Sequence, residues 1–115
     1  MAIANLALSY VGSQAWGSGS STLCETFVEK MAGCGWQGTS AIDAWRNNVP
    51  RQQTDMSQVQ PGDALYFGPH AENEYYGHTG IYTGIDSFTS VTAFGVKVYA
   101  LSAWVAPLLG FIRYE

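Results

Sequence analysis

The chain carries little positive charge, with five lysines and arginines against nine aspartates and glutamates and a net charge of −4 over 115 residues. Nucleic-acid binding needs clustered cations that neutralise phosphates, so this composition argues against a nucleic-acid partner. Long apolar runs are also missing: no stretch of about 18 apolar residues occurs, so we expect no segment that spans a membrane. The first six residues lack the basic start and apolar core of a secretory signal.

Cysteine is scarce as well, with two residues, Cys24 and Cys34. If a helix joins them, ten residues at about 1.5 Å each separate them by roughly 15 Å, too far for a disulfide. Two cysteines and two histidines do not have zinc-finger spacing, and the acidic residues are not spaced as calcium ligands. We therefore expect an unbridged thiol at Cys24, no metal site and no cofactor.

With 47% hydrophobic residues, the chain has enough apolar material for one domain over residues 1–115. Helical periodicity comes first along the chain and strand patterns follow, which indicates an α+β domain with N-terminal helices on a small antiparallel sheet. The helices are expected over residues 2–11, 23–32 and a segment after Ser40 that ends before Pro50. The strands are expected at Ala64–Phe67, His78–Thr83, Phe88–Ala93, Val96–Ala100 and Leu109–Tyr114.

Cys24 lies at the start of the second expected helix, where Thr22 and Glu25 have the spacing of a capping box. With Thr22 as N-cap, the unpaired N–H groups of the first turn favour a thiolate at Cys24. A helix terminus contributes about 0.3–1 kcal/mol, whereas one pKa unit is about 1.36 kcal/mol. The helix alone therefore lowers the thiol pKa by less than about one unit, and substantial activation needs a neighbouring imidazole.

His78 is the candidate for that imidazole, 54 residues after Cys24 at the start of an expected strand. Gly77 and Gly80 flank it and are expected to let a bulky substrate approach the sheet. Taken singly, a helix cysteine is more often a small buried hydrophobe, and a strand histidine is more often structural. The conjunction favours catalysis by a thiol nucleophile with an imidazole base. His70 has no such context and is interpreted as a loop residue.

The order of these motifs resembles the papain-like cysteine hydrolases of bacterial cell walls, the NlpC-type and CHAP families. The resemblance implies a papain-like fold and cleavage of amide bonds in peptidoglycan. By analogy, Cys24 attacks the carbonyl, His78 exchanges the proton, and the Cys24 backbone N–H holds the oxyanion. The segments that carry it are 7–12, Trp16-Gly17, Leu23-Cys24-Glu25-Thr26-Phe27-Val28, Gln60-Pro61-Gly62-Asp63-Ala64-Leu65-Tyr66-Phe67, Gly77-His78-Thr79-Gly80-Ile81-Tyr82-Thr83-Gly84, 94–98 and 109–114.

The family commonly has a polar third residue on the next strand that orients the histidine, and here that strand offers only hydroxyls. A three-residue loop at 84–86 would place Thr92 opposite His78, with Ser90 diagonal on the same face. A two-residue turn at 85–86 would instead place Ala93 opposite and remove both hydroxyls from the site. Ser90 and Thr92 are the candidates, beside the equal alternative that they are ordinary packed or exposed hydroxyls. Asn73 and Glu72 are further candidates on the preceding loop.

Two residues of the Gly/Ser-rich loop are assigned to substrate binding by the same resemblance. Trp16 is expected either to wall the cleft beside Cys24 or to fill the core. Gln14 stands where many NlpC-type relatives have a tyrosine. Trp36 and Trp45 are expected in the core or at its rim, and Asp63 is expected to close a turn.

The resulting expectation is a thiol endopeptidase or N-acetylmuramoyl-L-alanine amidase whose partner is bacterial peptidoglycan, with a separate wall-binding domain or subunit as a further partner. Without a signal sequence, it would act as a phage lysin made in the host cytoplasm or as a virion-associated module. One alternative is a dormant wall-binding or virion structural module. Another is an acyltransferase-type toxin that uses the same cysteine and histidine.

Overall fold

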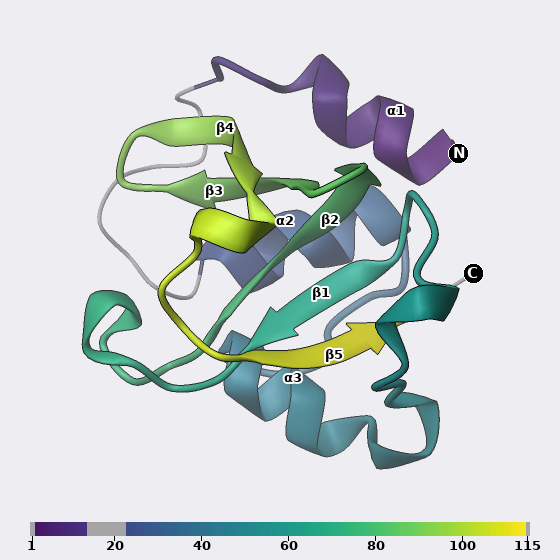
Figure 1. Ribbon diagram of the computed structural model, residues 1–115, viewed down its shortest axis with the longest axis vertical. Helices are drawn as coiled ribbons and strands as arrows, with labels where there is room; N and C mark the ends of the chain where they lie inside the picture. Colours follow the sequence, from purple (N-terminus) through teal and green to yellow (C-terminus); the bar gives the residue numbers. More distant parts are fainter. Residues whose placement is uncertain (1, 14–22, 115) are drawn as a thin grey trace.

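The computed structural model describes residues 2–13 and 23–114, and these form three α-helices and one five-stranded antiparallel sheet in the order β4-β3-β2-β1-β5 (Figure 1). The α+β fold class is confirmed. The strands and helices agree with the predicted ranges within a few residues at their ends. The helices are α1 (Ala2–Ser9), α2 (Leu23–Ala32) and α3 (Ala41–Asn47), and the strands are β1 (Ala64–Phe67), β2 (His78–Gly84), β3 (Ser87–Thr92), β4 (Gly95–Ala100) and β5 (Leu108–Ile112).

The three helices share one hydrophobic core with one face of the sheet, and Figure 1 shows α2 lying behind the strands. Strand β1 shows how the two faces differ, because successive side chains of a strand point in opposite directions. Its Ala64 and Tyr66 join the helix-side core, whereas Leu65 and Phe67 join a second cluster with Trp104. That second face is covered by connecting segments rather than by α-helices, so β1 is buried on both sides.

The β2–β3 hairpin combines both registers that the sequence left open. Its turn has two residues, so Gly84 pairs with Ser87. A bulge follows, after which Tyr82 pairs with Phe88, and the extra residue on β2 moves the register by one. Extended to the end of both strands, this second register sets Thr92 opposite His78. The bulge therefore recovers the pairing expected for a three-residue loop.

The two glycines around His78 serve the packing of the protein rather than the approach of a substrate, which corrects the prediction. A Cβ at Gly80 would lie 2.6 Å from Phe88 Cδ2 and 2.9 Å from the Thr89 carbonyl oxygen. Gly77 has a φ of +76°, and a Cβ there would lie 2.9 Å from the Phe67 carbonyl oxygen. The space beside Gly80 is filled by β3, and the space beside Gly77 is filled by β1 and by Ile42 of α3.

Within the described ranges, no helix combines the length and the hydrophobicity needed to cross a bilayer.

Helix α3 begins as predicted, because the Ser40 hydroxyl accepts a hydrogen bond from the Asp43 N–H at 3.4 Å. Trp45 packs in the helix-side core, whereas Trp36 is 70% exposed.

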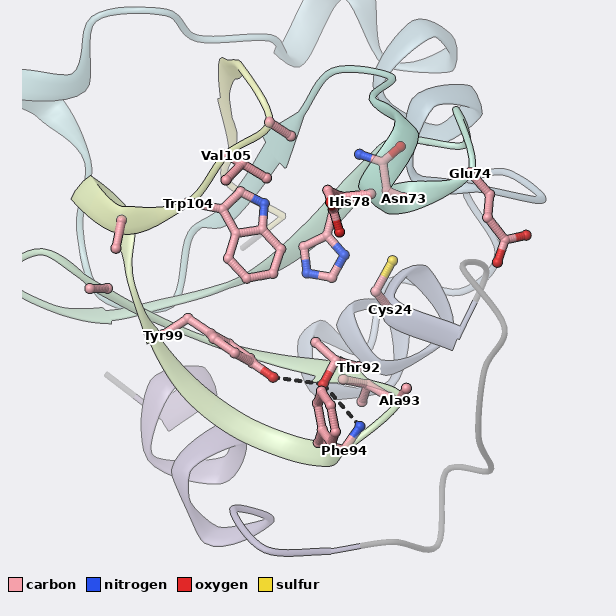
Figure 2. Close-up of a pocket in the computed structure, with 15 residues that line it drawn as sticks. Cys24, Asn73, Glu74, His78, Thr92, Ala93, Phe94, Tyr99, Trp104 and Val105 are labelled. Carbon is pink, nitrogen blue, oxygen red and sulfur yellow. Dashed lines mark hydrogen bonds between the residues drawn. The ribbon is translucent and has the colours of Figure 1, made fainter.

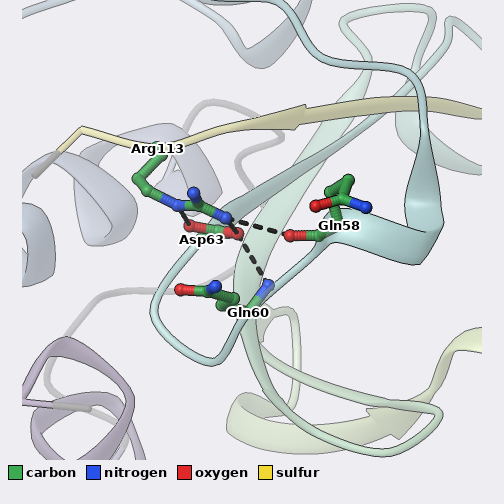
Figure 3. Close-up of polar contacts among 4 residues, drawn as sticks. All are labelled: Gln58, Gln60, Asp63 and Arg113. Carbon is green, nitrogen blue, oxygen red and sulfur yellow. Dashed lines mark hydrogen bonds and ion pairs between the residues drawn. The ribbon is translucent and has the colours of Figure 1, made fainter.

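Asp63 closes the turn before β1, as predicted, and also joins that turn to the segment after β5 (Figure 3). Its buried carboxylate accepts hydrogen bonds from the Gln60 N–H at 2.8 Å and from Arg113 Nε and a terminal guanidinium nitrogen at 2.8 and 2.9 Å. Arg113 also donates to the Gln58 carbonyl oxygen at 3.0 Å. The pair fixes β5 beside β1 at the end of the sheet remote from His78.

We expect Asp63→Ala to lower the free energy of unfolding by about 1.5–3 kcal/mol, because it takes the charged partner from the Arg113 guanidinium and the acceptor from the Gln60 N–H. Urea unfolding measures the change. Asp55→Ala is the control, since that exposed carboxylate caps only a short 3-10 turn through Ser57, and its loss should change stability much less than the loss of Asp63. Equal losses in both variants would contradict this account of Asp63.

Candidate active site

A pocket of about 580 Å³ opens between the start of α2, the start of β2 and the β3–β4 hairpin. Cys24 and His78 both line it, and Figure 2 shows the sulfur and the imidazole turned toward the same opening. The structure thus brings the predicted nucleophile and base together from opposite halves of the chain. One wall carries the aromatic side chains of Tyr99 and Trp104, and the other is formed by the polar loop before β2, which contributes Asn73 and Glu74.

Burial dominates the electrostatics of both groups. Cys24 is 1% exposed and His78 is 7% exposed. Burial raises the pKa of the Cys24 thiol to about 12, although hydrogen bonding with the Thr79 backbone opposes the rise. Burial also lowers the pKa of His78 to about 4. The favoured resting pair is therefore a neutral thiol beside a neutral imidazole, because desolvation outweighs the small stabilisation of a thiolate that was expected from the helix terminus.

Ser90 makes the hydrogen bond that orients the imidazole. Its Oγ lies 2.7 Å from His78 Nε2 and donates to the Thr79 carbonyl oxygen at 2.8 Å. A serine hydroxyl has one proton to give. Since that proton goes to the carbonyl, the hydroxyl must accept from an N–H at Nε2. This arrangement selects the tautomer of His78 that leaves Nδ1 as the basic nitrogen.

Thr92 also lines the pocket, but its hydroxyl is engaged elsewhere. Thr92 Oγ1 and the Tyr99 hydroxyl lie 2.6 Å apart, and Oγ1 accepts a hydrogen bond from the Phe94 N–H at 3.2 Å. These bonds tie β3 to β4 and shape the tip of the hairpin (Figure 2). The register places Thr92 opposite His78, but of the two predicted hydroxyls it is Ser90 that contacts the ring.

The loop before β2 holds the alternative candidates. The Asn73 side chain accepts from the N–H groups of His70 and Gly77 and donates to the Gly68 carbonyl oxygen. It therefore fixes the backbone that leads into His78. Glu72 lies on the pocket wall and is exposed. His70 caps a short 3-10 helix, Ala71–Asn73, through its Nδ1, in keeping with its interpretation as a loop residue.

Two features of the site were not predicted. The indole of Trp104 stacks on His78, with ring centroids 4.7 Å apart and planes inclined by 28°. The Glu25 carboxyl, expected to complete a capping box, is buried and accepts a hydrogen bond from the Tyr66 hydroxyl at 3.0 Å. Burial and then the Glu29 carboxyl raise the pKa of Glu25 to about 9. Neither feature had a local sequence signal, because each depends on residues distant in the chain.

The predicted substrate-binding residues Gln14 and Trp16, and the predicted N-cap Thr22, lie outside the described residues. Neither cysteine forms a disulfide, as predicted. Among residues 2–13 and 23–114, no three His, Cys, Asp or Glu side chains gather in a way that could hold a metal ion.

Two solved structures from Trichomonas vaginalis are similar to this chain. NlpC2 matches with a TM-score of 0.68 at 18% sequence identity, and NlpC1 with a TM-score of 0.65 at 17%. Both matches cover 97% of this chain. The fold is NlpC-like. The chain spans 44% and 42% of the two NlpC structures, so less than half of their length is represented here. No family model and no curated protein matches the sequence.

We expect alkylation to report the burial of the Cys24 thiol. In a Cys34→Ser variant, iodoacetamide should modify Cys24 slowly at pH 7, and the rate should keep rising above pH 9, because the raised pKa keeps the thiol protonated. Mass spectrometry of the modified peptide measures the rate at each pH. The same protein unfolded in urea provides the reference for an ordinary thiol. A rate that levels off below pH 8 would instead show a thiolate at rest.

Proposed function

We propose that this chain is a cysteine hydrolase that cleaves amide bonds in the stem peptides of bacterial peptidoglycan. The observation that carries the proposal is the assembly of Cys24, His78 and Ser90 at one pocket, with the imidazole held through Nε2. The NlpC-like fold supports the same proposal. In this chain it places Cys24 near the start of α2 and His78 at the start of β2, and both line one pocket.

The reaction starts from the neutral pair. As Cys24 Sγ attacks the carbonyl carbon, Nδ1 of His78 takes the thiol proton, and the backbone N–H of Cys24 donates to the developing oxyanion. The imidazolium then gives that proton to the leaving amine, and a thioester remains on Cys24. Water attacks the thioester with His78 as base, which releases the acid and restores the thiol.

The aromatic wall and the polar wall of the pocket suit a peptide with both apolar and polar groups. The net charge of −4 gives no long-range attraction to an anionic wall. We therefore include in the proposal that residues 1–115 act as one catalytic domain and that a separate domain or subunit holds the protein on the wall. A phage lysin or virion-associated module with CHAP-like activity fits this arrangement.

One observation favours a second candidate, a dormant wall-binding or virion structural module. The burial that raises the pKa of Cys24 and lowers that of His78 opposes formation of the thiolate–imidazolium pair. In a dormant module the pocket would bind muropeptides without cleaving them.

Incubation with purified peptidoglycan distinguishes the two candidates. We expect the wild type to release new amino groups, and Cys24→Ala and His78→Ala each to lower the rate at least about 100-fold, because each removes a group that acts in the transition state. Cys34→Ala is the matched control and should retain full activity, since Cys34 does not line the pocket. Mass spectrometry of the fragments identifies the bond, and an added amine reveals any acyl transfer. Muropeptide binding without release of amines would favour the dormant module.

Activity also separates the two hydroxyls of β3. We expect Ser90→Ala to lower kcat about 10-fold to 100-fold, because the imidazole loses both its orientation and its selected tautomer. Thr92→Val, two residues along the strand, removes a hydroxyl bonded to Tyr99 and should lower kcat less than about 5-fold. A larger loss in Thr92→Val than in Ser90→Ala would reverse the assignment.

A further inference from the structure

We propose that Trp104 is a positioning residue for His78: its indole covers one face of the imidazole, keeps the bond to Ser90 dry and stabilises the imidazolium during the reaction. The proposal deepens the proposed function and rests on it for the catalytic consequence. It adds a residue from the segment between β4 and β5, far in the chain from both Cys24 and His78.

The first observation is the stack itself. The indole and the imidazole lie nearly parallel, at 28°, with centroids 4.7 Å apart, and Figure 2 shows the indole beside His78 on the side away from Cys24. Phe67 and Phe88 complete the enclosure, with centroids 6.1 and 6.2 Å from the imidazole. His78 therefore has aromatic neighbours, a hydroxyl at Nε2 and an opening only toward the pocket.

The second observation is how firmly the indole is held. Trp104 packs edge-on against Phe88 and Tyr99, with centroids 5.1 and 5.0 Å away, and contacts Phe67 at 5.8 Å. Its backbone N–H bonds to the Leu101 carbonyl oxygen at 3.2 Å, at the end of a 3-10 turn over Leu101–Ala103. Because these contacts immobilise the indole, the indole restricts rotation of the His78 imidazole instead of rotating with it.

The chemistry of the two rings explains what the stack does. A neutral imidazole gains apolar contact from the indole face. Once His78 takes the thiol proton, the same face lies within about 6 Å of a cation, a distance at which an aromatic ring attracts it. The attraction exists only in the charged form, so it lowers the barrier without tightening the resting state.

Other ionisable groups line the same pocket, so a pH experiment must distinguish the titration of His78 from theirs. Cys24 lies on α2, Tyr99 on β4, and Glu72 and Glu74 on the loop before β2. A Cys24→Ala background removes the thiol, so the titration of His78 can be followed by NMR without turnover. That measurement also stands if the proposed hydrolysis fails.

The experiment compares Trp104→Phe, Trp104→Leu and a control, Trp45→Leu, which removes a buried indole from the helix-side core. In the Cys24→Ala background, Trp104→Leu should lower the pKa of His78 further below its ordinary value, because an aliphatic side chain still excludes water from the ring but offers no attraction to the imidazolium. Trp104→Phe keeps an aromatic face and should hold the pKa near that of the parent. Trp45→Leu should leave the pKa unchanged while lowering stability.

With Cys24 present, Trp104→Leu should lower kcat about 10-fold to 30-fold with a small change in KM, the loss expected for a desolvated cation–π contact. Trp104→Phe should recover most of that loss. Where Trp104→Leu does not fold, Trp104→Met takes its place. An unchanged or raised pKa in Trp104→Leu, or an equal shift in Trp45→Leu, would overturn the proposal. A shifted pKa in a protein without hydrolytic activity would retain the role of Trp104 toward His78 and reject the proposed function instead.

Discussion

The apolar enclosure of His78 is the constraint on which the rest of the site depends. Phe67, Phe88 and Trp104 surround the imidazole, and the sheet supplies two of these rings because β1 and β3 flank β2 on either side. Desolvation lowers the pKa of the ring, so His78 is neutral at rest. In the proposed hydrolysis, the residues would therefore be positioned in advance, and the imidazole would become charged only when substrate reacts.

Within that enclosure, one hydroxyl determines how the histidine can act. A carboxylate can only accept a hydrogen bond from a ring nitrogen. The Ser90 hydroxyl has a rotatable proton and could either donate to the nitrogen or accept from it. The Thr79 carbonyl oxygen removes this choice by taking the proton. Thr79 and His78 are adjacent on β2, so the strand that carries the histidine also sets its tautomer. Ser90 and the Thr79 carbonyl oxygen together orient the imidazole.

The sequence predicted the helices and strands because periodicity and capping residues are local signals. The meeting of Cys24 with His78 has no local signal, and it was predicted from the conjunction of the two motifs and from the family resemblance of their order. The hairpin was predicted in part. Its turn length and its register disagreed with each other, and the bulge before Gly84 reconciled them through a residue that no pattern marked. The stack of Trp104 on His78 and the bond between Glu25 and Tyr66 connect residues 26 and 41 positions apart. Such contacts follow from the three-dimensional packing, and so do the pKa values that burial produces.

Glu25 completes the electrostatic picture around the nucleophile. A carboxylate adjacent to Cys24 would raise the pKa of the thiol further and work against the helix terminus. With its own pKa raised to about 9, Glu25 is protonated at neutral pH and adds no charge beside the sulfur. The thiol, the imidazole and the carboxyl are then all neutral at rest, which is the least costly state for a buried cluster. In the proposed hydrolysis, the first charges would then be those of the reaction itself, on the oxyanion beside the helix terminus and on the imidazole beneath the indole.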